Sequence, residues 1–256
     1  SIVGKNFNAE AGYVPSHGVY PGQINYFMTT TLKFYPGKNI VYTGPQFSVF
    51  QTYISGNILT DKQYSLGYNF NFTNTATLLL SLNYVYSRLT NSFNPIDPTR
   101  YTEFQSGEAY NWKTVSANFT SNTRKLINVT AQSTYGGFYN GTNLNANGQL
   151  NFRFQPIGNI SLRFDYNDLR LQSGYGREKL FLVGPRVDLT FTDKIFLTTY
   201  YQYNNLLNNM NLNARFQWRY KPASDFYIVY TENYLPETFF SRNRAIVFKF
   251  TYWLNI

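Results

Sequence analysis

The side chains best suited to chemistry in this sequence are charged residues set among apolar neighbours. They are Lys33, Arg153, Arg163, Asp165, Arg186, Asp188, Arg215, Arg219 and Lys249. Successive side chains of an extended chain point to opposite sides, so the alternation predicts that these charges share one polar face. In a narrow, water-filled space, an array dominated by Lys and Arg would focus the electric field and favour anions.

A structural role fits the same residues equally well. The arginines would then pair with the neighbouring acids and with backbone groups, and so stiffen a wall or hold a plug. The sequence alone leaves both interpretations open.

Catalytic and metal chemistry find little support in the sequence. There is no Cys, and the one histidine, His17, lies among Pro, Ser and Gly in a predicted loop. A hydrolase or transferase would need a base beside a nucleophile, and no phosphate loop or paired zinc ligands appear. We therefore expect no enzyme, catalytic residue, metal or cofactor. The predicted connection Thr90–Tyr110 carries Asp97, Glu103 and Glu108, which leaves a calcium site as an alternative to a plain solvated loop.

The elements that would position the charges are β-strands. In the clearest segment, Tyr64, Leu66, Tyr68, Phe70 and Phe72 alternate with polar residues, and a period of two predicts a strand. The pattern recurs fourteen times. The predicted ranges are about 5–14, 23–35, 40–54, 62–73, 77–89, 111–120, 127–139, 144–155, the segment after Asn159, the segment after Lys179, 194–204, 211–221, 226–233 and 245–256.

A membrane location follows from composition and from the spacing of the turns. Aromatic residues make up 20% of the 256 residues, which suits the aromatic girdles of transmembrane barrels. No apolar run approaches the roughly 20 residues of a spanning helix. Tight turns such as Pro36–Asn39 alternate with connections that include every long one. We predict an all-β chain, a single domain over 1–256, folded as a transmembrane antiparallel outer-membrane β-barrel of about 14 strands; a large soluble sandwich is the alternative.

The two ends of the chain resemble a known family. The opening Asn6–Pro15 is similar to the stretch NFNPEVGFVPR, where the barrel begins in an uncharacterised outer-membrane family of Bacteroidota, and the close resembles it over Asn213–Pro222, Ser224–Thr231 and Asn243–Asn255. The resemblance implies an upstream carbohydrate-binding-like module, absent from this chain. It implies location and fold more than activity, because the family has no established one. The terminal strand, with Phe248, Phe250, Tyr252, Leu254 and Ile256 on one face, would carry the insertion signal.

The expected function is a pore or channel for small polar or anionic solutes in the bacterial cell outer membrane. The alternative is a plugged barrel that anchors a larger export or uptake complex. Outer-membrane lipid and lipopolysaccharide are the expected partners, with partner proteins in the second case. The net charge of +9 is scattered through the strands, so nucleic acid is not expected. Large inward residues (Tyr42, Phe50, Tyr200, Tyr227 and Trp253) favour obstruction, whereas small polar ones favour an opening.

Overall fold

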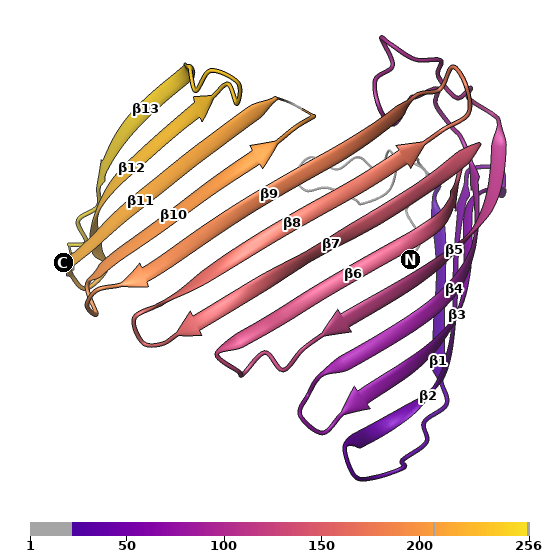
Figure 1. The fold of residues 1–256 in the computed structure, drawn as a ribbon, viewed down its shortest axis with the longest axis horizontal. Coiled ribbons are helices and arrows are strands. Elements are labelled where there is room, and N and C mark those ends of the chain that lie inside the picture. Colours follow the sequence, from indigo (N-terminus) through magenta and orange to yellow (C-terminus); the bar gives the residue numbers. More distant parts are fainter. Residues whose placement is uncertain (1–21, 207, 255–256) are drawn as a thin grey trace. The chain divides into compact units, whose positions relative to one another are not determined.

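The computed structural model describes residues 22–206 and 208–254. These residues form one sheet of thirteen strands, and the strands lie side by side in the order of the chain (Figure 1). The strands are β1 (Ile24–Thr31), β2 (Ile40–Ile54), β3 (Ile58–Phe72), β4 (Thr77–Arg88), β5 (Ala109–Thr120), β6 (Ile127–Phe138), β7 (Gly141–Phe154), β8 (Gly158–Arg170), β9 (Arg177–Thr190), β10 (Ile195–Asn204), β11 (Asn209–Lys221), β12 (Ser224–Tyr234) and β13 (Ser241–Phe250).

The described chain falls into two compact units. The first takes in residues 22–118, 133–144 and 168–178, and the second takes in residues 119–132, 145–167 and 179–254. Strands β5 to β9 contribute residues to both. The candidate sites below each lie within one unit and are described there.

The prediction of an all-β antiparallel fold is confirmed. Thirteen of the fourteen predicted strands correspond to β1–β13, and β2 has the predicted bounds, Ile40–Ile54. The other prediction, at 5–14, lies outside the described residues, as does the loop with His17. Within the described chain β1 pairs only with β2, and β13 pairs only with β12. The structure therefore shows an antiparallel sheet that is not closed into a barrel within the described residues.

The final strand differs from its prediction. β13 begins at Ser241 and ends at Phe250, so Phe248 and Phe250 lie in it, whereas Tyr252 and Leu254 follow it. The ladder stops because the partner strand does: Thr251 exchanges backbone hydrogen bonds of 2.8 and 3.1 Å with Asp225, and β12 begins one residue before, at Ser224. Ile256 lies outside the described residues.

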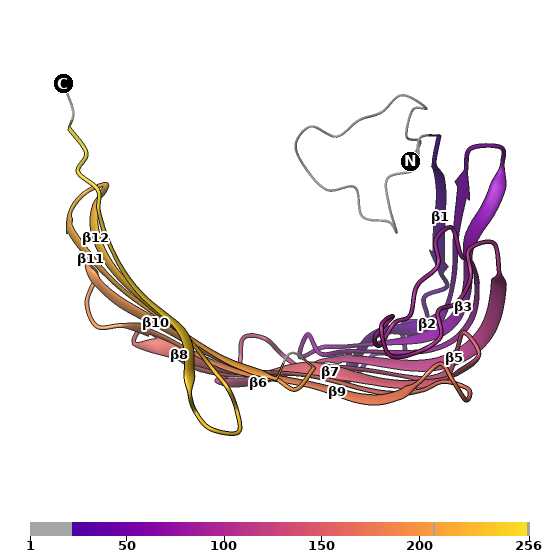
Figure 2. The same cartoon turned by 90° about the horizontal axis from the view of Figure 1, so that it is seen from above.

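One face of the sheet is apolar and exposed. Leu66 and Leu82, which are opposite each other on β3 and β4, are 58% and 59% exposed, and Phe248 on β13 is 66% exposed. Buried apolar side chains are few in the described chain: Ala76, Leu89, Phe104, Leu169, Leu171 and Met210. Both views show strands and connections only in the described chain (Figure 1, Figure 2). The described residues include no helix long and apolar enough to cross a membrane.

A basic residue outside the set predicted for the polar face lies on the apolar face, near the start of β3. Lys62 lies on the same face as Tyr64, with its Nζ 5.4–5.6 Å from the ring centroids of Tyr64, Tyr84 and Tyr86. The rings attract the ammonium group, and its stem covers apolar surface. The cation is therefore tolerated at this position.

A second charged group on the apolar face joins β12 to β13. Glu232 lies on the same face of β12 as Tyr230 and Ile228, yet its side chain is only 1% exposed. Its Oε1 accepts hydrogen bonds of 3.1 and 2.8 Å from Arg244 Nε and Nη2, and the hydroxyls of Tyr230 and Tyr234 donate to Oε2. Both oxygens of the carboxylate therefore accept hydrogen bonds, and the two bonds from Arg244 to Oε1 tie the last strand to β12.

Candidate functional site

A polar cavity of about 640 Å³ lies in the second unit, among strands β7 to β11. Four of the charged residues predicted from the sequence line it: Arg163, Arg186, Asp188 and Arg215. The remaining lining residues are polar or small and are contributed by the same strands: Gln149, Asn159, Ser161, Gly184, Thr198, Tyr200 and Asn213. A cavity of this size and composition can hold a small hydrated or polar solute.

Strand register brings these side chains together in two adjacent rows. In the first row, Tyr200 of β10 stands opposite Arg186 of β9 and Asn213 of β11. Residues directly opposite in an antiparallel pair have Cβ atoms about 5 Å apart. The side chains of each row are therefore neighbours across three strands.

The second row contains one acidic and one basic side chain. Thr198 of β10 stands opposite Asp188 of β9 and Arg215 of β11. Thr198 Oγ1 donates a hydrogen bond of 2.9 Å to Asp188 Oδ1, which positions the carboxylate. One face of β9–β11 thus presents two arginines and one aspartate within two rows.

Most of the positive charge in the cavity is paired. Arg186 Nε and Nη2 donate bonds of 2.8 and 2.9 Å to the two oxygens of Asp188, two residues further along the strand. Arg163 Nε lies 3.1 Å from Asp165 Oδ2, again two residues away. Arg215 forms no ion pair with any described residue. The pairing role thus fits Arg163 and Arg186, and the role of attracting anions falls to Arg215.

The other predicted charges lie away from this cavity. Arg153 Nη1 donates a 2.8 Å bond to the carbonyl of Thr123, and Arg219 Nε lies 3.4 Å from Asp225 Oδ1. Lys249 is opposite Tyr227 on β12. Lys33, in the first unit, follows β1, and its Nζ lies 4.6 Å from the ring centroid of Tyr42. None of these four lines the cavity.

Tyr200 and Gly184 shape the cavity; the sequence predicts Tyr200 as a large inward residue, whereas Gly184 is not among the predicted site residues. A Cβ atom on Gly184 would lie 3.1 Å from Cε2 and Oη of Tyr200, so glycine leaves room for the ring. The spacing of residues along the strands could have identified such lining residues, because side chains two residues apart lie on the same face. Gly184 lies two residues before Arg186, and Asn213 lies two before Arg215. The ring of Tyr200 narrows the space beside Arg186.

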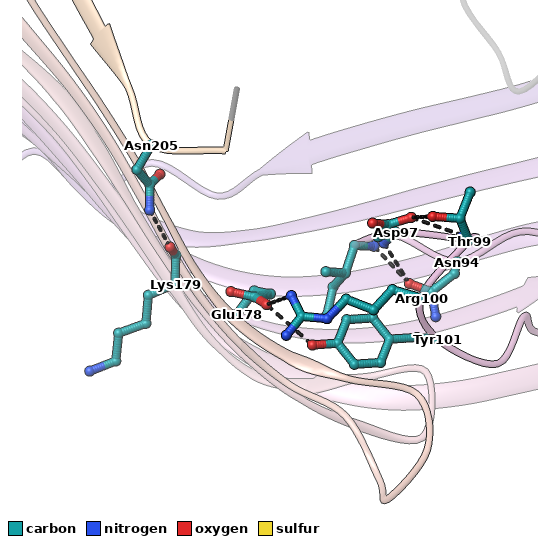
Figure 3. Close-up of polar contacts among 9 residues, drawn as sticks. Asn94, Asp97, Thr99, Arg100, Tyr101, Glu178, Lys179 and Asn205 are labelled. Atoms are coloured by element: carbon teal, nitrogen blue, oxygen red, sulfur yellow. Dashed lines mark hydrogen bonds and ion pairs between the residues drawn. The ribbon is translucent and has the colours of Figure 1, made fainter. Parts of the chain in front are cut away.

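A second organised region is the connection between β4 and β5, residues 89–108, in the first unit. It is held against the start of β9 (Figure 3): Arg100 Nη1 lies 3.3 Å from Glu178 Oε1, and the hydroxyl of Tyr101 donates a 3.2 Å bond to the same oxygen. Asn94 Nδ2 donates to the carbonyls of Thr102 and Tyr175 at 2.7 and 3.1 Å. The connection is a fastened structure, unlike a plain solvated loop.

An aromatic cluster anchors this connection to the polar face. Phe104 is completely buried, and its ring centroid lies 5.0 Å from that of Tyr139 and 4.7 Å from that of Tyr175. Tyr139 in turn packs on Trp112 of β5, with ring centroids 5.0 Å apart. Trp112 alternates in phase with Ser116, whose hydroxyl accepts a bond from Asn83 on the polar face. The connection therefore folds onto the polar face of the first unit.

The acidic residues of this connection act within its turns. Asp97 Oδ1 accepts bonds of 2.8 and 2.7 Å from the backbone N–H and the hydroxyl of Thr99. Glu108 Oε2 accepts bonds of 2.6 and 3.0 Å from the hydroxyl of Tyr110 and the N–H of Gln105. Across residues 22–206 and 208–254, no three His, Asp or Glu side chains gather as a metal site requires.

These hydrogen bonds predict that the turns loosen in acid. The hydroxyl of Thr99 lowers the pKa of Asp97 below its ordinary 3.8, and the hydroxyl of Tyr110 lowers the pKa of Glu108 below its ordinary 4.5. A carboxyl whose pKa is lowered by folding stabilises the folded form above its ordinary pKa, and this contribution is lost as pH falls through the lowered value. We expect hydrogen exchange at the amides of Thr99 and Gln105, corrected for its intrinsic pH dependence, to lose protection as pH falls below about 4.

The amide of Arg124 provides the control for that measurement. It donates a 2.9 Å bond to Asn122 Oδ1, an acceptor that does not titrate. Its corrected protection should stay constant over the same pH range. An equal loss at all three amides would point to general unfolding instead.

The described residues thus provide a polar cavity with an unpaired arginine and a fastened connection over the polar face. No protein-family model matches the chain, and no curated protein matches it.

Proposed function

We propose that this chain spans the bacterial outer membrane as a closed β-barrel, with its apolar face toward lipid. The exposed apolar face of the sheet carries the proposal, because Leu66, Leu82 and Phe248 would otherwise face water. Strands of 8–15 residues suit a span that needs about 9–11. A bilayer also requires closure of the sheet, because every unpaired backbone group in lipid costs several kcal/mol.

The residues near the strand ends support the same orientation in lipid. Lys62 among Tyr64, Tyr84 and Tyr86 has the composition of a membrane–water interface, where amphipathic rings and basic side chains meet headgroups. Lipid and lipopolysaccharide are the partners that this face would contact.

Passage of small polar or anionic solutes is the function that the polar face supports best. The polar cavity of about 640 Å³ lies on this face, and Arg215 is its unpaired charge. A cavity lined by these polar and basic side chains would admit hydrated solutes and favour negatively charged ones.

A plugged barrel that anchors a larger export or uptake complex is the second candidate. The connection 89–108 favours it, because Phe104 and its aromatic neighbours fasten that segment onto the polar face. The first unit would then be closed to solutes and serve for attachment.

Adjacent residues of β4 provide the test of membrane insertion. Leu82→Arg places a charge on the apolar face, and Ser81→Arg places the same charge on the polar face, opposite Gly67. A charge facing the middle of a bilayer costs about 2–4 kcal/mol. We expect Leu82→Arg to lower the temperature at which the folded form is lost on SDS gels, and Ser81→Arg to leave it nearly unchanged. A chain that tolerates both substitutions equally would have its apolar face in water, and the membrane proposal would be wrong.

Single-channel conductance in planar bilayers separates the pore from the anchor. Open steps with anion preference support the pore. Silent membranes that contain correctly inserted protein support the anchor.

A further inference from the structure

A second cavity, of about 320 Å³, lies in the first unit between the connection 89–108 and the ends of β2, β3 and β4. It is distinct from the cavity that contains Arg215. Its lining residues are Gln23, Thr52, Thr60, Asp61, Ser87, Arg88, Leu89, Thr90, Asn91, Phe93 and Tyr139. The volume is at the small end of known ligand sites.

Asp61 is the acidic residue among those that line this cavity. It faces Ser87 across the β3–β4 pair, and Ser87 Oγ donates a 3.0 Å bond to Asp61 Oδ1. Arg88 also lines the cavity but forms no ion pair with Asp61. The carboxylate is therefore oriented by the hydroxyl of Ser87 and forms no ion pair with a described cation.

The other polar groups of the wall bond to one another. Thr60 Oγ1 donates a 3.2 Å bond to the carbonyl of Thr52, and Thr52 Oγ1 donates a 2.9 Å bond to Asn25 Oδ1. Thr52 and Thr60 are 5% and 4% exposed. Their hydroxyl protons are used, and Gln23, Thr90 and Asn91, which also line the cavity, have partners of their own.

Apolar and aromatic groups complete the wall. Leu89 is 8% exposed, and the rings of Phe93 and Tyr139 meet edge to face with centroids 5.4 Å apart. Tyr139 is held in the turn after β6 with a φ of 49°. Aromatic faces attract cations as well as hydrocarbon, and the attraction grows when the site is dry.

We propose that this cavity binds a small organic ammonium ion with an apolar or aromatic body. The ammonium group meets Asp61, and the body packs on Leu89, Phe93 and Tyr139. A free carboxylate beside apolar walls fits this chemistry better than it fits a sugar, which needs several unengaged polar partners. The site is built within the first unit and does not depend on whether the chain conducts solutes.

The experiment uses the full chain folded in detergent and isothermal titration with 2-phenylethylammonium. The neutral isostere 2-phenylethanol, titrated in the same way, measures the contribution of the charge. We expect the ammonium ion to bind at least tenfold more tightly than the alcohol. We also expect Asp61→Asn, which keeps the shape of the side chain, to remove that difference. Equal binding of the two probes to the wild-type chain, or no binding of either, would overturn the proposal.

Two variants with matched changes sharpen the test. Asp193→Asn removes a carboxylate from the exposed turn between β9 and β10 and should leave affinity unchanged. Arg88→Gln removes the cation that lines the cavity and should leave ammonium binding intact or strengthen it. If 3-phenylpropanoate binds instead and Arg88→Gln abolishes that binding, the cavity is an anion site and the assignment to Asp61 is wrong.

Discussion

Replacing Arg215 by Glu is expected to reduce the anion preference of the conducting barrel about tenfold or more. Arg215 is the arginine of its cavity that forms no ion pair with a described carboxylate, and Asp188 interacts with it only electrostatically. Arg186 and Arg163, by contrast, are paired with Asp188 and Asp165. A unit charge about 4 Å from an ion in water is worth about 1 kcal/mol. The substitution changes the charge by two units. The ratio of chloride to potassium permeability, from reversal potentials in a salt gradient, measures the effect.

Arg124→Glu is the control for this experiment. It makes the same change of charge in the exposed turn between β5 and β6, away from the cavity. We expect it to alter selectivity little at a salt concentration where the screening length is a few Å. Equal effects of the two substitutions would mean that net charge sets the preference. An unchanged ratio in Arg215→Glu would mean that ions do not pass this cavity.

Replacing Phe104 by Ala is expected to release the connection 89–108 from the polar face. Phe104 is fully buried and contacts Phe93, Tyr110, Tyr139 and Tyr175. Loss of a buried Phe side chain typically costs about 3–5 kcal/mol. Much of this loss should appear as local opening of the connection 89–108, because the surrounding strands keep their backbone hydrogen bonds to one another.

Trypsin cleavage after Arg100 measures that opening. Because each 1.4 kcal/mol changes an equilibrium about tenfold, cleavage should become about a hundredfold to a thousandfold faster when opening precedes cleavage. Phe239→Ala is the control, because Phe239 is 70% exposed in the connection between β12 and β13. If Phe104→Ala is cleaved no faster than the wild-type chain, the aromatic cluster does not hold the connection in place.

Alternation of side chains was enough to predict most of the strands. The alternation is clearest in β3, and β2 is a strand whose predicted and observed bounds coincide, at Ile40–Ile54. The last strand shows the limit of this reasoning. Its alternation continues through Tyr252 and Leu254, but a strand needs a neighbour, and β12 begins at Ser224. The extent of the partner is a property of the register, which one segment does not encode.

The sequence predicted the charged residues that line the candidate cavity, but it did not predict which of them form ion pairs. Parity placed Arg163, Arg186 and Arg215 on one face, and the structure gathers them around one space. The alternation of side chains could not show that Arg186 and Arg163 form ion pairs while Arg215 does not. The pairing depends on side-chain rotamers and on Thr198, which lies opposite Asp188 on the neighbouring strand and donates to it. The burial of Phe104 could not be predicted from the alternation of side chains either, because the connection 89–108 has no regular alternation.

The order of the strands has a consequence for how the sheet assembles. Each strand lies beside its neighbour in the chain, so most ladders require only a short segment to close before pairing begins. Closure entropy grows slowly with segment length, and topologies rich in pairing between chain neighbours tend to fold faster than those with distant partners. The sheet can therefore grow by one hairpin at a time from any nucleus. The step from β4 to β5, across residues 89–108, carries the largest entropic cost of these hairpins.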